Sequence, residues 1–178
     1  MRNGTCTAAG TGRAGGFTLV ELIVVIIVLM IAAAVVIPNI GTASDTQATS
    51  AARTLASDLE MARNLALMTQ RPHTVLFSPT RQSYKIVADY SGGTYAATQA
   101  IPHPVVVGKR FEVTLAEHNG MGNVQVTNVS FGGDARVTFD ALGDPSSAGT
   151  ITLQTAGMQM EVSVAGLTGS VSTHRVTN

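Results

Sequence analysis

Tryptophan is absent from this chain of 178 residues, other aromatic residues are few, and Cys6 is the only cysteine. A single cysteine excludes an intrachain disulfide, so a domain outside the cytoplasm must rely on its core or on assembly. Lysine is scarce, and Lys109-Arg110 is the longest basic run in a chain of zero formal net charge. Such a chain offers no extended basic surface, and nucleic acid is not expected as a partner.

Residues that could carry catalysis or bind a metal are poorly placed for either task. The four histidines stand in unrelated settings without the spacing typical of zinc ligands, at His73, His103, His118 and His174. Asp134, Asp140 and Asp144 lack the Asp-x-Asp-x-Asp spacing of a calcium loop. The sequence therefore predicts no catalytic residue, no metal and no cofactor, and a chain that is not an enzyme.

What the chain does contain is a polar leader followed by a long apolar run. Residues 1–16 are small, polar and basic, with Arg2 and Arg13 and no acid. From Phe17 to Ile37 come 21 residues, about 31 Å as a helix, which matches the thickness of a bilayer core. The basic leader predicts a single-pass membrane segment with a cytoplasmic N-terminus and an extracytoplasmic C-terminal domain.

One acidic residue, Glu21, interrupts the apolar run. A carboxylate at the centre of a membrane helix costs roughly 2.5–3.5 kcal/mol, and such residues usually have a partner or a function. Glu21 follows Phe17 by one helical turn, close enough to the end of the run for its carboxylate to reach the interface. The charge alone fits either an interfacial position or a pairing role.

Two kinds of N-terminal segment fit this pattern. An ordinary secretory signal would be cut near Ala32-Ala33-Ala34 and would release a β-domain that begins at Val35. A retained anchor would lose its leader before Phe17. Glu21 and the continued apolar run argue against the secretory signal, and Gly15-Gly16 leaves an accessible backbone for a protease directly before Phe17.

The stretch Gly16-Phe17-Thr18-Leu19-Val20-Glu21-Leu22 resembles the class III signal of type IV pilins and type II secretion pseudopilins. The resemblance implies that a prepilin peptidase cuts between Gly16 and Phe17 and methylates the new amine of Phe17. It implies that Glu21 pairs with the N-terminal amine of a neighbouring subunit during assembly with other pilins. It also implies an inner-membrane location before entry into a pilus or pseudopilus.

Pro38 ends the apolar run, and an amphipathic helix is predicted after it, over residues 39–71. Proline stops a helix or kinks it, and in the resembled family a proline at this place lies within one long helix. The predicted buried face repeats at threes and fours, through Ala48, Ala51, Leu55, Leu59, Ala62 and Ala66. The opposite face is polar, with Arg53, Ser57, Glu60 and Asn64.

Beyond Arg71-Pro72 the period changes to that of β-structure. Seven strands are predicted, at 73–77, 83–88, 110–116, 124–131, 136–140, 150–155 and 158–165, with a surface loop at 89–104. The predicted fold is α+β, with a long N-terminal helix packed on an antiparallel sheet or sandwich. The predicted divisions are a leader (1–16), a transmembrane and assembly helix (17–38), an amphipathic helix (39–71) and a β-rich domain (72–178).

A second resemblance lies in the C-terminal part of the chain. Residues 58–66, 71–75, 137–145, 149–153, 162–164 and 169–171 are similar to segments of the H-type pseudopilins, the GspH/FimT group. The implied function is a minor pilin-like structural subunit of a type II secretion pseudopilus or type IV pilus. A DNA-uptake minor pilin is the alternative within the family, although only His174 and Arg175 are basic near the C-terminus.

Overall fold

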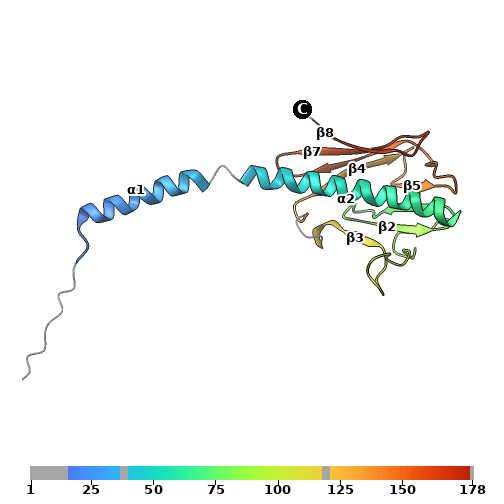
Figure 1. Ribbon diagram of the computed structural model, residues 1–178, viewed down its shortest axis with the longest axis horizontal. Helices are drawn as coiled ribbons and strands as arrows, with labels where there is room; N and C mark the ends of the chain where they lie inside the picture. Colours follow the sequence, from blue (N-terminus) through green and yellow to red (C-terminus); the bar gives the residue numbers. More distant parts are fainter. Residues whose placement is uncertain (1–15, 37–39, 118–120, 177–178) are drawn as a thin grey trace, which may run out of the picture. The chain divides into compact units, whose positions relative to one another are not determined.

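The computed structural model describes residues 16–36, 40–117 and 121–176, and the chain divides into two units, Met1–Asn39 and Ile40–Asn178. The first unit contains α1 (Leu19–Val36), and the second contains α2 (Ile40–Thr69) with eight described strands (Figure 1). The α+β class is thereby confirmed. Pro38, where a kink is predicted, lies outside the described residues, as do residues 1–15 of the leader.

Helix α2 has one buried face and one solvent face, as its sequence period predicts. The buried face is built from alanine and leucine, each at most 1% exposed, namely Ala48, Ala51, Ala52, Leu55, Leu59, Ala62 and Ala66. Arg53, Glu60 and Asn64 are exposed on the other side. The helix ends before Gln70, which has a φ of 53° and whose side-chain amide donates to the Leu67 carbonyl. A residue in the left-handed region followed by Pro72 is a typical helix terminator.

The strands form two antiparallel sheets of four strands each. The first has the order β3-β2-β1-β5, and consists of β1 (His73–Phe77), β2 (Ser83–Ala88), β3 (Glu112–Thr114) and β5 (Arg136–Phe139). The second has the order β4-β6-β7-β8, and consists of β4 (Gln125–Phe131), β6 (Gly149–Gln154), β7 (Gln159–Val164) and β8 (Val171–Val176). Helix α2 packs against strands of both sheets, so one helix face closes one continuous core.

A hydrogen bond inside this core joins α2 to the first sheet. The Tyr84 hydroxyl, on β2, donates to the Asp58 carboxylate across 2.5 Å, and Tyr84 is only 1% exposed. Burial raises the pKa of Tyr84 well above its usual value, and the charge of Asp58 and the hydrogen bond to it raise the pKa further. Tyr84 therefore stays neutral in the folded domain up to a higher pH than an unperturbed tyrosine does.

The segment between β2 and β3 contains the surface loop predicted at 89–104, and part of this loop packs on Lys85 of the first sheet. Lys85 is 4% exposed because its ammonium donates to the Thr98 carbonyl (2.7 Å) and lies 4.0 Å from the centre of the Tyr95 ring. Leu76 and Val87 are also buried, but neither belongs to the main core cluster. The segment is thus ordered by a cation–π contact and hydrogen bonds rather than by regular structure.

Later in the same segment lies an exposed turn, which we call the valine tip. It consists of Val105, Val106 and Val107. Nδ1 of His103 accepts hydrogen bonds from the amides of Val105 (3.2 Å) and Val106 (3.1 Å), and the imidazole stacks on Phe111. Strand β3 begins after Phe111, at Glu112. It is followed by the 3-10 helix η2 (Leu115–Glu117). The predicted strand at 110–116 is therefore shorter than expected.

Leu59→Ala tests the packing of α2 on both sheets. Leu59 is fully buried in the core, and truncation of a core leucine costs about 2–5 kcal/mol because it leaves a cavity. We expect a loss in this range in the free energy of unfolding of the purified full chain in detergent, measured by denaturant titration. Glu60→Ala, one residue along on the exposed face, should change the free energy of unfolding by less than about 0.5 kcal/mol. Equal losses would contradict this packing.

Tyr84→Phe tests the coupling of core stability to pH. Because the folded pKa of Tyr84 is raised, its contribution is complete below the unfolded value of about 10 and is lost as the pH rises through the folded value. The free energy of unfolding of the wild type should therefore fall more steeply above about pH 10 than that of Tyr84→Phe. Parallel pH profiles for the two proteins would show that Tyr84 ionises freely in the folded state.

Candidate functional site

The described part of the chain begins at the junction between Gly16 and Phe17, in irregular backbone before α1. The Phe17 side chain is 83% exposed. A Cβ built on Gly16 meets no atom within 4 Å, and its φ lies outside the left-handed region. Nothing in the described part of the chain therefore requires glycine at this position.

Thr18 caps the N-terminus of α1, and Glu21 stands in the first turn. The Glu21 amide donates to the Thr18 hydroxyl across 3.2 Å, and the Leu22 amide donates to the Thr18 carbonyl across 3.2 Å. Thr18 and Glu21 thus occupy the N-cap and N3 positions of the Thr-x-x-Glu capping pattern. The carboxylate also lies at the positive end of the helix dipole, which stabilises a negative charge. This cap was not predicted, although the spacing of threonine and glutamate in the sequence signals it.

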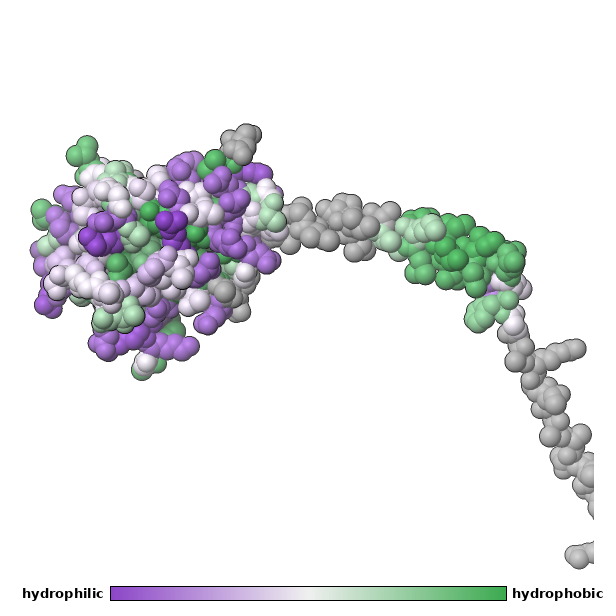
Figure 2. Space-filling model, turned by 180° about the vertical axis from the view of Figure 1, so that it is seen from behind, coloured by the Kyte–Doolittle hydropathy of each residue, from purple (hydrophilic) through white to green (hydrophobic). Residues whose placement is uncertain are grey.

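Helix α1 is apolar all round, in contrast to α2. Figure 2 shows this helix in the colours of hydrophobic residues, whereas the globular unit is mixed. Large apolar side chains from Leu19 to Ile31 are all between 42% and 75% exposed, and a helix with no polar face requires an apolar environment or partner. Within the described residues, no helix combines the length and the apolar character needed to cross a membrane.

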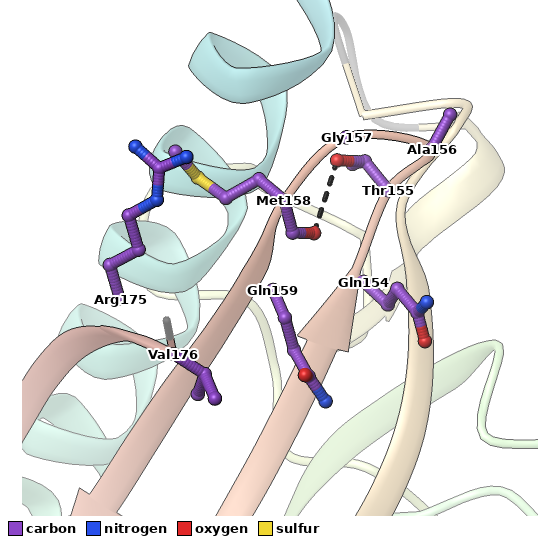
Figure 3. A pocket seen from close by; sticks show the side chains of 8 residues that line it. All are labelled: Gln154, Thr155, Ala156, Gly157, Met158, Gln159, Arg175 and Val176. Atoms are coloured by element: carbon purple, nitrogen blue, oxygen red, sulfur yellow. Dashed lines mark hydrogen bonds between the residues drawn. The ribbon is translucent and has the colours of Figure 1, made fainter. Parts of the chain in front are cut away.

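The described part of the globular unit has a polar hollow and scattered ionisable side chains. No group of three or more histidine, cysteine, aspartate or glutamate residues suited to a metal lies among the described residues. Figure 3 shows a hollow of about 330 Å³ between the β6–β7 turn and the end of β8. Polar and aliphatic side chains line it, together with the side chain of Arg175. His174 lies 3.1 Å from the Glu161 carboxylate, so one of the two basic residues near the C-terminus faces an acid.

Comparison with known families settles what kind of chain this is. The sequence profile described as "Type II transport protein GspH" matches residues 51–168. The chain belongs to the GspH family. The profile described as "Prokaryotic N-terminal methylation motif" matches residues 12–37, which include Gly16, Phe17 and Glu21. No curated protein matches the chain.

Solved structures share the fold of this GspH-family chain at low sequence identity. The minor pseudopilin EpsH of the type 2 secretion system of Vibrio cholerae superimposes with a TM-score of 0.53 at 12% identity, over 72% of this chain and 97% of EpsH. A second EpsH structure gives 0.54 at 11%, over 75% and 96%. The type IV minor pilin FimU of Pseudomonas aeruginosa gives 0.52 at 16%, over 73% and 90%. These likenesses confirm the predicted pilin-like fold.

The GspH-family chain is a minor pilin-like (pseudopilin) subunit, a structural component rather than an enzyme. Its N-terminal methylation motif implies processing by a prepilin peptidase, a membrane anchor and assembly with other pilins or pseudopilins. The predicted family, fold and broad function are therefore confirmed. The roles of Gly16, Phe17, Glu21 and Pro38 stay predictions.

Proposed function

We propose that the chain is cut between Gly16 and Phe17 and then enters a type II secretion pseudopilus or type IV pilus through α1. The observation that carries the proposal is the arrangement around the junction, where an exposed, unconstrained Gly16-Phe17 bond directly precedes a capped apolar helix. Cleavage there removes Arg2 and Arg13 and creates an ammonium on Phe17, which the peptidase methylates. The methylated amine keeps its positive charge.

In this proposal residues 17–38 anchor the subunit in the inner membrane until assembly. The 21 apolar residues of Phe17–Ile37 match a bilayer core in length, and the basic leader favours a cytoplasmic N-terminus with the domain from residue 40 on the other side. Entry into the filament then exchanges lipid contacts of α1 for contacts with neighbouring helices. Small residues such as Ala32 and Ala33 permit close approach of those helices.

Glu21 supplies the register between subunits. An unpaired carboxylate in lipid is costly, and pairing with the Phe17 ammonium of the next subunit removes that cost. The Thr18 cap places Glu21 in the first turn, so its carboxylate is presented at a fixed height on the helix. Only one axial offset between neighbouring helices then matches both charges. A head-to-tail contact of this kind generates an open filament rather than a closed ring.

The DNA-uptake alternative finds no support in the charge distribution. Cleavage leaves nine basic and eleven acidic residues, a formal charge of 9 − 11 = −2. Non-specific affinity for nucleic acid comes mainly from neutralisation of phosphates by clustered lysine and arginine. Arg71 and Arg136, moreover, are paired with Asp89 and Asp134. A structural role in the filament is thus favoured.

Gly16→Ala tests the cleavage site. Because Gly16 packs against nothing within the described chain, alanine should leave α1 and the domain intact while it blocks the peptidase. In cells that express the peptidase, intact-mass measurement should find the leader retained on most of the Gly16→Ala protein and absent from the wild type. Gly15→Ala, one residue earlier, is the matched control and should mature normally. Normal maturation of Gly16→Ala would place the cut elsewhere.

Glu21→Gln separates the charge of Glu21 from its place in the helix cap. Glutamine at N3 serves a capping box as glutamate does but cannot pair with an ammonium, so we expect normal maturation and membrane level, with cross-linking to partner pilins lowered at least about tenfold. Thr18→Ala is the complementary control, since it removes the cap and keeps the charge; cross-linking should persist. Wild-type cross-linking by Glu21→Gln would leave Glu21 as a helix-capping residue only.

A further inference from the structure

Each of the two sheets ends in two edge strands, and an unprotected edge strand is a template for pairing with another chain. The edge strands are β3 and β5 in the first sheet and β4 and β8 in the second. Three of the four are protected by residues that the structure describes. Strand β3 has only three residues, and β5 is covered by a turn, since the Ser146 amide donates to the Thr138 carbonyl across 2.7 Å. The register of β4 breaks at Thr127, whose carbonyl accepts a hydrogen bond from Arg81 (2.7 Å).

Strand β8 has none of these protections. It consists of six residues in unbroken register with β7, from Val171 opposite Val164 to Val176 opposite Gln159. It forms the margin of the second sheet (Figure 1), and no described strand or bridge lies on its free side. The edge at β8 is therefore long and regular enough to accept a further strand.

The backbone of β8 alternates between groups that bond to β7 and groups that are directed to the free side. The Ala165 amide donates to the Ser170 carbonyl (3.0 Å) just before β8 begins, and this bond sets the alternation. In an antiparallel ladder every second pair of residues is bonded, so the amides and carbonyls of Val171, Thr173 and Arg175 are directed away from β7. Each of these residues offers one donor and one acceptor to an added strand.

Side chains of β8 are engaged on one face of the sheet and free on the other. On the outer face, Ser172 and His174 contact polar side chains of β7 across 2.8 Å and 3.1 Å. On the core face, Thr173 and Arg175 are exposed, although the β7 residues opposite them are buried. In the part of the chain that the structure describes, neither Thr173 nor Arg175 has a hydrogen-bond or ion-pair partner for its side chain. Arg175 lines the hollow of Figure 3, so its guanidinium is accessible.

The charge of Arg175 indicates which strands fit the edge. A guanidinium is best satisfied by a carboxylate, and a charge on an edge strand disfavours strands that cannot pair with it. Strands β4, β5 and β8 contain no acid, and the Glu112 carboxylate of β3 accepts a hydrogen bond from the Tyr95 hydroxyl (2.9 Å). The described edge strands of a second copy of this chain therefore offer no free acid. A different subunit whose strand carries an acid on the core face supplies the missing partner.

We infer that β8 accepts an extended, acid-containing segment of a different pilin-like subunit, which adds to the second sheet as a further strand. The inference rests on the proposed function, which supplies the co-assembly of this chain with other subunits. Backbone hydrogen bonds to Val171, Thr173 and Arg175 hold the added strand, whatever its side chains are. The carboxylate that meets Arg175 sets the register of the added strand and selects the subunit that provides it.

Photo-cross-linking of the full chain in cells that contain the partner pilins tests this inference. A benzophenone amino acid replaces Ser172 in β8, Val107 in the valine tip as an exposed control, or Ile26 in α1 as a monitor of assembly. We expect the probe at Ser172 to form adducts with a different pilin-like subunit, mapped by mass spectrometry to a segment that contains an acidic residue. The probe at Val107 should form few such adducts.

Two substitutions at Thr173 test the backbone contacts. Thr173→Pro removes an amide that is directed to the free side and leaves the ladder to β7 intact, because proline is tolerated where an edge amide faces solvent. It should lower the yield of adducts from the Ser172 probe about tenfold, without change in the level of mature protein. Thr173→Val keeps the amide and should leave the yield within about twofold. Equal yields from the two variants would overturn the inference.

Substitutions at Arg175 test the charge, and they decide the matter if Thr173→Pro does not fold. Arg175→Glu places like charges opposite one another and should lower the adduct yield about tenfold, whereas Arg175→Lys keeps the positive charge and should retain most of it. Arg53→Glu, which makes the same change of charge on the exposed face of α2, is the matched control and should have no effect. Equal losses from Arg175→Glu and Arg53→Glu would overturn the inference, because the effect would then be general.

The α1 probe separates this inference from the function on which it depends. Pilin adducts from Ile26, together with adducts from Ser172 to a second copy of this chain, to nucleic acid, to unrelated proteins or to nothing, would overturn the role of β8 and leave the proposed function standing. Absence of pilin adducts from both positions would overturn the proposed function and the inference with it. Adducts from both positions, with the expected losses in Thr173→Pro or Arg175→Glu, support both.

Discussion

Burial of a single helix face is the constraint on which the globular unit depends. Two four-stranded sheets have no other described element that covers them both, and α2 packs against each. Its buried face consists of alanines around Leu55 and Leu59, which let the helix backbone approach the strands closely. Because the core is shared, loss of packing on α2 affects both sheets. The Tyr84–Asp58 hydrogen bond adds a directional contact at the same interface.

Parts of the fold with strong local signals were predictable from the sequence, and parts that depend on distant contacts were not. Strands β1 and β2 match their predicted bounds, since β1 lies between Pro72 and Ser78-Pro79 and β2 follows the turn that Ser78-Pro79 begins. Strand β8 was missed, since an edge strand with four exposed residues between Val171 and Val176 shows no apolar alternation. The loop predicted at 89–104 is present, but its packing on Lys85 was not predicted, because the burial of this lysine is explained only by Tyr95 and Thr98 in space.

The N-terminal site shows a similar division. Gly16, Phe17 and Glu21 are evident from a short linear motif, and the N-terminal methylation profile matches the residues that contain it. The bond from the Glu21 amide to the Thr18 hydroxyl needs coordinates to be recognised, although its spacing is local. It gives the first turn of α1 a defined geometry of its own. The first turn of α1, which carries Glu21, is therefore capped by contacts within the chain itself.

Residues 89–99 contribute no side chain to the main core, and they are held on the first sheet by Lys85, which bonds to the Thr98 carbonyl, and by Tyr95, which bonds to Ser83 and Glu112. Mutations in this segment are consequently insulated from the packing that holds α2 to the sheets. Related proteins can vary the length and the side chains of this segment while the framework of α2 and the two sheets stays constant. The outer face of the first sheet is thus where the fold is free to diversify. Subunits with the same framework can present different surfaces there.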